Sequence, residues 1–248
     1  MIAAHLVQFD VAPLDPARNF ARMAEFIRAE AAAGADLILF PELSNTGYVE
    51  PLMPGGPFVS AVPHYGEALC AACAEPGGKE IAALAALAAE LKVTLVAGLG
   101  LRDARLAGVI HNASVLITPE GVAGHYVKTH QWQTEKLYFT PGDALPVFPA
   151  LGTRLGMQIC YDIRFPEVTR ALAAQGADIV TSALGVLRRR WCPGGGRGPF
   201  RASRLYPRRR ERRLLPVLQP RWGAGRPAVL RALLCPCARR SRPGPSGP

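Results

Sequence analysis

Over the first 186 residues, two patterns of hydrophobic and polar positions follow one another along the chain. Short aliphatic runs bounded by turn residues are typical of strands, and apolar residues three or four apart are typical of helices. Strands are predicted over 3–9, 37–40, about 93–101, 112–118, 122–128, two within 146–161 and 179–181, and helices over about 15–34, 78–91 and 165–175. This alternation predicts an α/β layered fold.

The first predicted helix has well-marked ends. Asp15 is suited to cap it, and Pro16 is suited to its first position, where a missing N–H costs nothing. Gly34 is placed to end it. Four large apolar side chains fall on one helical face, which is therefore predicted to pack on a sheet: Phe20, Met23, Phe26 and Ile27.

A short repeat links the two ends of this region. Ala31-Ala-Ala-Gly-Ala-Asp36 resembles Ala173-Ala-Gln-Gly-Ala-Asp178, and each stretch follows a predicted helix and precedes a buried strand. Two helix–strand units with the same junction suggest a pseudo-symmetric sandwich.

The net charge of +10 is divided very unevenly. Residues 1–186 contain 12 Lys and Arg against 18 Asp and Glu, which gives a net charge of −6. Residues 187–248 contain 17 Arg, no Lys and a single acid, Glu211, which gives +16. The sequence therefore predicts a mildly acidic globular domain over 1–186 and a separate Arg/Pro/Gly-rich tail over 187–248 that is disordered or out of frame.

The composition of the tail favours an out-of-frame origin. It lacks Lys, Asp, Asn, Ile, Met, Thr and His, whose codons are mostly A/T-rich, and is dominated by residues with G/C-rich codons. We interpret it as an out-of-frame translation of a GC-rich gene. The alternative is a genuine basic arm that binds nucleic acid through the phosphate backbone.

Membrane, leader and metal signals are weak. No run approaches the ~18 consecutive apolar residues of a membrane span, and the opening MIAAHLVQFD reaches Asp10 too soon for a signal peptide. We therefore expect a cytoplasmic protein without membrane contact. Cys70-x-x-Cys73 has half the pattern of a zinc site, but the body has no second pair with that spacing, so no metal is expected.

Three residues whose side chains could take part in catalysis directly follow predicted strands, where the sites of such folds usually lie. Glu42 directly follows Leu-Ile-Leu-Phe-Pro and is expected to be a half-buried carboxylate that acts as a general base. Lys128 ends an apolar strand and is placed to stabilise negative charge on a substrate oxygen. Cys160 ends another strand, and Asp162 and Arg164 follow it. A thiol at a strand-to-helix turn beside such charges is suited to become a nucleophile.

The segments around these residues together resemble the nitrilase superfamily of carbon–nitrogen hydrolases. FPELSNTGY, YVKTHQWQTEKLYFTPGD and GMQICYDIRFPE match its three catalytic motifs in order and at suitable spacing, over residues 1 to about 185. The resemblance implies a four-layer α-β-β-α sandwich, incomplete here at the C-terminus. It also implies that no metal or cofactor is needed.

The resemblance also implies a role for each site residue. Glu42 would take the thiol proton, Cys160 would attack the substrate carbon and Lys128 would hold the oxyanion. Glu135 falls at the position of the second glutamate, which supports the lysine and the substrate amine. Two tyrosines are expected to support the site or bind substrate: Tyr48, which ends the first motif, and Tyr161, whose backbone N–H is a candidate second oxyanion donor.

The residues after the cysteine favour one branch of the superfamily. Members that cleave nitriles usually carry Cys-Trp-Glu, whereas Cys160-Tyr-Asp-Ile-Arg-Phe-Pro-Glu167 is similar to the amidases and carbamoylases. We therefore expect hydrolysis of an aliphatic amide or N-carbamoyl substrate with release of ammonia. The partners expected are this small molecule and a second copy of the chain, with no nucleic acid.

Two other functions stay open. One is a catalytically impaired relative whose basic tail binds nucleic acid, and the other is an acyltransferase that passes its acyl group to an amine through the same triad. The superfamily continues beyond this region with further strands and an Ala-x-Glu-Asn-type helix, which is not recognisable in 187–248. A sheet without those strands exposes an edge and core, so we expect the chain as written to fold poorly and to be inactive.

Overall fold

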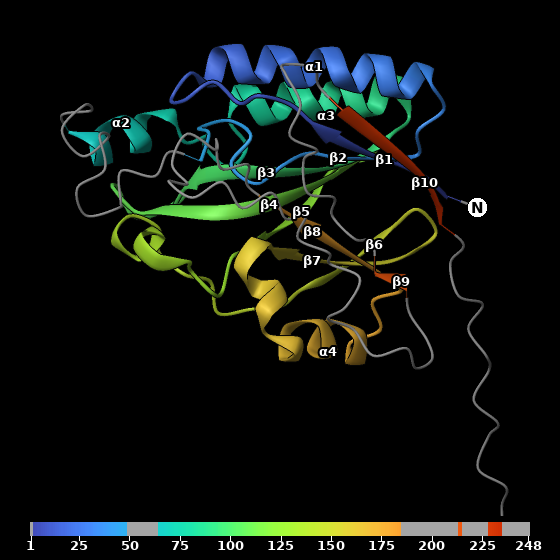
Figure 1. The fold of residues 1–248 in the computed structure, drawn as a ribbon. Helices are drawn as coiled ribbons and strands as arrows, with labels where there is room; N and C mark the ends of the chain where they lie inside the picture. Colours follow the sequence, from blue (N-terminus) through green and yellow to red (C-terminus); the bar gives the residue numbers. More distant parts are fainter. Residues whose placement is uncertain (1, 49–63, 185–212, 215–227, 235–248) are drawn as a thin grey trace, which may run out of the picture.

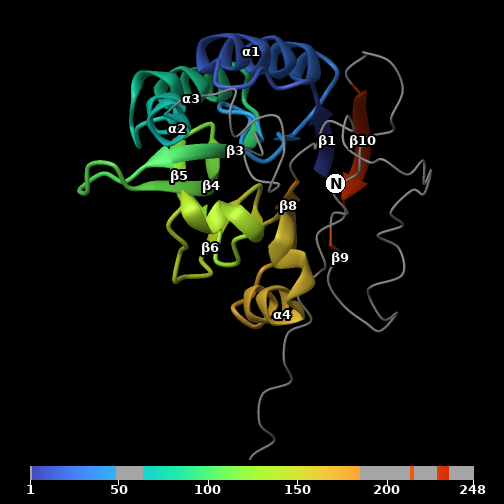
Figure 2. The same cartoon turned by 60° about the vertical axis from the view of Figure 1, so that its left-hand side comes forward.

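A computed structural model describes residues 2–48, 64–184, 213–214 and 228–234. Two β-sheets stack face to face between outer helices (Figure 1), and Figure 2 shows the same layers from another side. The helices α1 and α3 lie side by side on the outer face of the larger sheet, and α4 lies on the outer face of the smaller one. The predicted four-layer α-β-β-α sandwich is therefore confirmed.

The larger sheet has six strands in the order β10-β1-β2-β3-β4-β5, and the smaller one has four in the order β6-β7-β8-β9. The strand bounds in the larger sheet are β1 Ile2–Gln8, β2 Leu37–Leu39, β3 Thr94–Arg102, β4 Ile110–Thr118, β5 Gly121–Val127 and β10 Ala228–Leu234. Those in the smaller sheet are β6 Val147–Ala150, β7 Thr153–Ile159, β8 Ile179–Ala183 and β9 Arg213–Leu214. The α-helices are α1 Pro16–Ala32, α2 Tyr65–Ala72, α3 Lys79–Leu91 and α4 Pro166–Ala174.

The junction repeated in the sequence builds the same turn in both sheets. Gly34 after α1 and Gly176 after α4 both have positive φ, +86° and +95°, which glycine adopts without a Cβ penalty. The aspartate two residues later then ties the turn to a neighbouring strand. Asp36 accepts a 2.7 Å hydrogen bond from the backbone N–H of Ala3, and Asp178 accepts one of 2.7 Å from the Thr153 hydroxyl. The two helix–strand junctions are therefore built alike, and the pseudo-symmetry of the whole sandwich stays a prediction.

The space between the two sheets holds an apolar core that brings the catalytic strands together. Alternate residues of the facing strands supply it, because successive side chains of a strand point to opposite faces. These residues are Ile2, Ala4, Leu6, Leu37, Leu39, Val96, Leu116, Tyr126, Ala150, Leu155, Met157, Ile159 and Ile179. The strands β2, β5 and β7 all end at the margin of this core, so the residues that follow them meet there.

Two features differ from the pattern read in the sequence. The helix α2 was not predicted, since it is only eight residues long and its N-cap residue, His64, makes no side-chain capping bond. Within the Arg-rich region the structure describes two strands, and β10 pairs antiparallel with β1 along the whole of Ile2–Gln8. The remaining residues of 187–248 lie outside the described part of the chain, so the tail boundary stays a prediction.

Among the described residues, no helix combines the length and the apolar character needed to cross a membrane.

Candidate active site

Glu42 lies three residues beyond β2 and is more deeply buried than expected, with 1% of its surface exposed. The backbone here crosses directly over β3, which is possible because residue 98 is a glycine. A Cβ on Gly98 would lie 2.3 Å from the carbonyl oxygen of Pro41 and 2.7 Å from the Glu42 Cα. The loop is then anchored by the Ser44 N–H, which donates a 2.7 Å hydrogen bond to the Gly98 carbonyl. Close packing of the Pro41–Glu42 backbone on Gly98 thus fixes the position of the buried Glu42 carboxylate.

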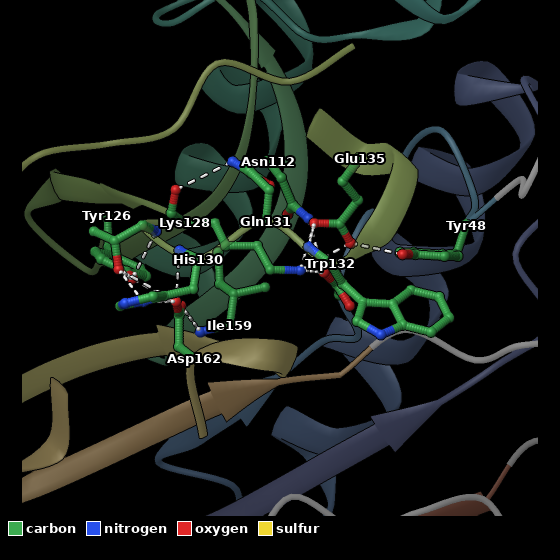
Figure 3. Close-up of polar contacts among 12 residues, drawn as sticks. Tyr48, Asn112, Tyr126, Lys128, His130, Gln131, Trp132, Glu135, Ile159 and Asp162 are labelled. Carbon is green, nitrogen blue, oxygen red and sulfur yellow. Dashed lines mark hydrogen bonds and ion pairs between the residues drawn. The ribbon is translucent and has the colours of Figure 1, made fainter. Parts of the chain in front are cut away.

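Lys128 follows β5 and is fully buried. Its Nζ lies 2.6 Å from Oε1 of Glu42 and 2.8 Å from Oε2 of Glu135, so two carboxylates compensate one buried ammonium (Figure 3). Burial by itself lowers the pKa of Lys128. The negative charges of Glu42, Cys160 and Glu135 outweigh burial and hold the pKa above its ordinary value. The lysine therefore stays cationic and can stabilise developing negative charge.

Glu135 lies on a short 3-10 helix, η1 (Gln133–Leu137), that approaches the lysine from the side. Its Oε1 accepts a 2.6 Å hydrogen bond from the Tyr48 hydroxyl, and its Oε2 accepts one of 3.0 Å from the Trp132 backbone N–H. Burial and then the charge of Glu42 raise the pKa of Glu135, while Lys128 and the hydrogen bonds oppose that rise. The structure thus brings Glu135 to the lysine, as the motif match implied, and brings Tyr48 to Glu135.

Cys160 is the first residue after β7 and begins a second 3-10 helix, η2 (Cys160–Arg164). Its φ of +42° is a left-handed backbone conformation that non-glycine residues rarely adopt and that marks functional turns. Burial, followed by the charge of Glu42, raises the pKa of the Cys160 thiol well above its usual value, and Lys128 opposes the rise. The resting group is therefore a thiol held beside a base.

The charges that act on the thiol are not its neighbours in sequence. Asp162 and Arg164 were expected to flank it, but the carboxylate of Asp162 turns away toward Tyr126 and the His130 backbone. The groups that shift the thiol pKa are Glu42, Lys128 and Glu135. In a 3-10 helix, side chains two residues apart point about 120° away from each other around the axis, so proximity in sequence did not bring the carboxylate to the thiol.

Tyr161 lies just beyond the nucleophile, and its ring packs edge-on against Phe165 with centroids 5.4 Å apart. The role of its backbone N–H as a second oxyanion donor stays a prediction.

Asn112 is a site residue that the sequence reading missed. It lies in β4, is fully buried and donates a 2.7 Å hydrogen bond from Nδ2 to Oε1 of Glu42. Its backbone carbonyl also accepts a 2.9 Å hydrogen bond from the Lys128 N–H. One signal was available, because an amide in the middle of an apolar strand must find a buried polar partner.

Across the described ranges, no group of three or more His, Cys, Asp or Glu side chains is arranged to hold a metal ion. Cys70 and Cys73 are free thiols, and burial raises the pKa of Cys73 to about 12.

Comparison with known proteins gives a consistent assignment. The carbon–nitrogen hydrolase family matches residues 3–209, which extends past the boundary predicted at 186. An (R)-stereoselective amidase from a Pseudomonas species is 35% identical over 221 residues, which cover 89% of this chain and 71% of that enzyme. A nitrilase from Pyrococcus abyssi is 32% identical over 73% of this chain and 63% of its own length.

Solved structures agree with these relatives. The amidase from Nesterenkonia sp. AN1 superposes with a TM-score of 0.60 at 27% identity, covering 77% of this chain and 69% of that one. A mutant of that amidase shows the result of Michael addition of acrylamide at its active site cysteine. The chain thus spans between about three fifths and seven tenths of the length of these relatives. By the extent of the family match and by the identity to the amidase, this chain belongs to the carbon–nitrogen hydrolase family.

Proposed function

We propose that this protein hydrolyses the carbon–nitrogen bond of a small amide or N-carbamoyl compound through a thioester at Cys160, with release of ammonia. The observation that carries the proposal is the buried pair of Glu42 and Lys128, 2.6 Å apart, whose charges both act on the Cys160 thiol. A nucleophile beside a base that a third group orients is the arrangement that nucleophilic catalysis requires. Amidases among the relatives support the same chemistry.

In the first half of the reaction, the Cys160 sulfur attacks the carbonyl carbon as its proton passes to Glu42. The carbonyl π electrons move to oxygen, and the ammonium of Lys128 stabilises the resulting oxyanion. Collapse of this intermediate breaks the C–N bond, and Glu42 returns the proton to the departing nitrogen, which leaves as ammonia. Because the raised pKa keeps the thiol protonated at rest, proton transfer and attack are coupled.

In the second half, Glu42 takes a proton from a water molecule that attacks the thioester carbon. Lys128 again stabilises the oxyanion, the C–S bond breaks and the sulfur regains the proton from Glu42. An amide gives a carboxylic acid. An N-carbamoyl amine gives a carbamate, which decomposes to carbon dioxide and the amine. Each half of the reaction thus uses one base and one cation in the same places.

Glu135 serves the reaction by holding Lys128 as a second carboxylate, in addition to Glu42. The bonds from Tyr48 and Trp132 fix both of its oxygens, so the lysine cannot swing out of the pocket without leaving a buried carboxylate unpaired. We propose that the substrate nitrogen lies near this carboxylate.

The direct test measures ammonia release from a panel of aliphatic amides and N-carbamoyl amines. The chain, with the reading frame after residue 186 restored where the chain as written is inactive, is expected to act on a member of the panel. Cys160→Ala in the same chain is expected to lose more than about 1,000-fold of kcat. Circular dichroism of both proteins controls for folding. Hydroxylamine added as a competing amine separates hydrolysis from acyl transfer, since a transferase forms the hydroxamate in preference to the acid. Equal activity in the wild type and in Cys160→Ala would refute the proposal.

A further inference from the structure

Asp162 is a fully buried carboxylate that the catalytic steps do not use. Its two oxygens accept hydrogen bonds from Ile159, Tyr126, Thr129 and His130. Figure 3 shows Asp162 between Tyr126, His130 and Ile159. Oδ2 lies 2.9 Å from the Ile159 N–H and 2.7 Å from the Tyr126 hydroxyl. Oδ1 lies 3.0 Å from the His130 N–H and from its ring Nδ1, and 3.2 Å from the Thr129 hydroxyl.

These donors belong to two segments that carry different catalytic groups. Ile159 directly precedes Cys160 at the end of β7, in the smaller sheet. Tyr126, Thr129 and His130 surround Lys128 at the end of β5, in the larger sheet. One carboxylate therefore joins the turn that presents the thiol to the segment that presents the ammonium.

The turn at Cys160 requires such a restraint. A left-handed backbone conformation at a non-glycine residue is strained and persists only where the surroundings over-determine it. The bond from Asp162 back to the Ile159 N–H closes the backbone over the strained residue from its C-terminal side. The ring of His130 also stacks on Phe165 with centroids 3.8 Å apart, which holds the segment around Lys128 against the start of α4.

The Tyr126 phenol is held in its donor form. Burial, followed by the charge of Asp162, raises the pKa of Tyr126, so the hydroxyl keeps its proton and donates it to the carboxylate. The same hydroxyl accepts a 3.1 Å hydrogen bond from the Thr129 N–H, the first backbone group after Lys128. The backbone next to Lys128 is thus linked to Asp162 by hydrogen bonds through the Tyr126 side chain.

We propose that Asp162 is a positioning residue that sets the distance between the Cys160 thiol and the Glu42–Lys128 pair. The inference rests on the function proposed above, but the restraint itself is a property of the fold. In Asp162→Asn, the side-chain NH2 would face N–H or O–H donors where the carboxylate oxygen had accepted their hydrogen bonds. Either the turn at Cys160 or the segment around Lys128 would then lose its hydrogen bonds to residue 162. A displacement of about 1 Å at the reacting atoms costs on the order of 100-fold in rate.

The test compares Asp162→Asn with Asp178→Asn. Asp178 is the matched control because it also bonds β7, at the opposite end of the strand, through Thr153 and the Arg154 N–H. Both variants lose buried or partly buried hydrogen bonds and are expected to unfold at lower temperature. Only Asp162→Asn is expected to lower kcat, by about 100-fold with little change in KM. A kcat within threefold of wild type, or an equal fall in Asp178→Asn, would overturn the proposal.

A second readout does not depend on substrate. Iodoacetamide labelling of Cys160, followed across pH by mass spectrometry of its peptide, reports the state of the thiol. Release of the turn moves the thiol toward water and away from Glu42, so its labelling profile is expected to shift to lower pH in Asp162→Asn and not in Asp178→Asn. This arm decides the proposal even if the wild-type chain hydrolyses no amide, and an unchanged profile in Asp162→Asn would then refute it.

A second single variant covers the case in which Asp162→Asn fails to fold. Tyr126→Phe removes one hydroxyl from the same network and retains the ring, with Tyr138→Phe as its control in the separate aromatic pair with Tyr65. Tyr126→Phe is expected to lower kcat about tenfold and to shift Cys160 labelling in the same direction. Where both single variants fold, their effects on kcat should be less than additive, and full additivity would contradict a shared restraint.

Discussion

Asn112 donates a hydrogen bond to the same oxygen of Glu42 that Lys128 contacts, the two donors lying 2.7 and 2.6 Å from Oε1. Two donors from neighbouring strands fix the rotation of the carboxylate, whose charge acts on the Cys160 thiol. The base is therefore oriented by one neutral and one charged partner before any substrate enters.

This relationship predicts the effect of removing the amide. Asn112→Ala leaves the ion pair with Lys128 intact but frees the carboxylate to rotate, so kcat should fall about 10- to 100-fold with a smaller change in KM. Ser114→Ala is the matched control, because Ser114 is the next residue on the same face of β4 and its buried hydroxyl has no protein partner. Steady-state kinetics of both variants check this, and equal losses would contradict it.

Glu42→Gln should separate the activity of the enzyme from the acidity of its thiol. Without its base, the enzyme is expected to lose at least 100-fold of kcat. The charge of Glu42 raises the pKa of Cys160, so its removal stabilises the thiolate and lowers that pKa. Alkylation of Cys160 should then begin at lower pH than in wild type. A labelling profile shifted to higher pH would show that a group other than Glu42 determines the pKa of the Cys160 thiol.

Lys128→Met should destabilise the fold in a pH-dependent way. Removing the cation leaves Glu42 and Glu135 buried without their counter-charge, which costs about 3–5 kcal/mol at neutral pH. Burial already raises the pKa of Glu135, and loss of Lys128 raises it further. A raised carboxyl pKa favours the folded state at low pH and loses that contribution as pH rises. Urea unfolding should therefore show the variant gaining stability from pH 8 to pH 5.

Gly98→Ala tests the close packing below Glu42. The new Cβ would meet backbone atoms of Pro41 and Glu42 at 2.3 and 2.7 Å, so the catalytic loop must move and both activity and melting temperature should fall. Gly66→Ala in α2 is the control, since its Cβ would meet only the Tyr138 ring at an ordinary 3.6 Å. A fully active Gly98→Ala enzyme would show that the loop position does not matter.

The Arg-rich region makes a prediction about the gene. Resequencing codons 180–195 should reveal another frame that continues with an Ala-x-Glu-Asn-like helix and ordinary acidic residues, and the restored chain should melt at a higher temperature than the chain as written. A confirmed frame, together with an active chain as written, would refute both the frameshift and the expected poor folding.

The strands and the longer helices were predictable because each has a regular pattern and a marked end, such as Asp15-Pro16 before α1. The three catalytic residues were predictable because each follows a strand within a recognisable motif. Asn112 was not, since its role depends on β4 and the loop after β2 meeting through strand order. The full burial of Glu42 was also missed, because it follows from the absence of a side chain at Gly98, more than fifty residues away.

The catalytic groups are divided between the two sheets. Glu42 and Lys128 follow strands of the larger sheet, and Cys160 follows a strand of the smaller one. Each sheet keeps its own ladder of backbone hydrogen bonds, yet the reacting distance exists only while the two are seated face to face. Mild heat or denaturant that weakens the packing between the two sheets should abolish activity before the far-ultraviolet circular dichroism of the strands changes. The rate of turnover therefore reports the packing of the two sheets more sensitively than any measure of secondary structure.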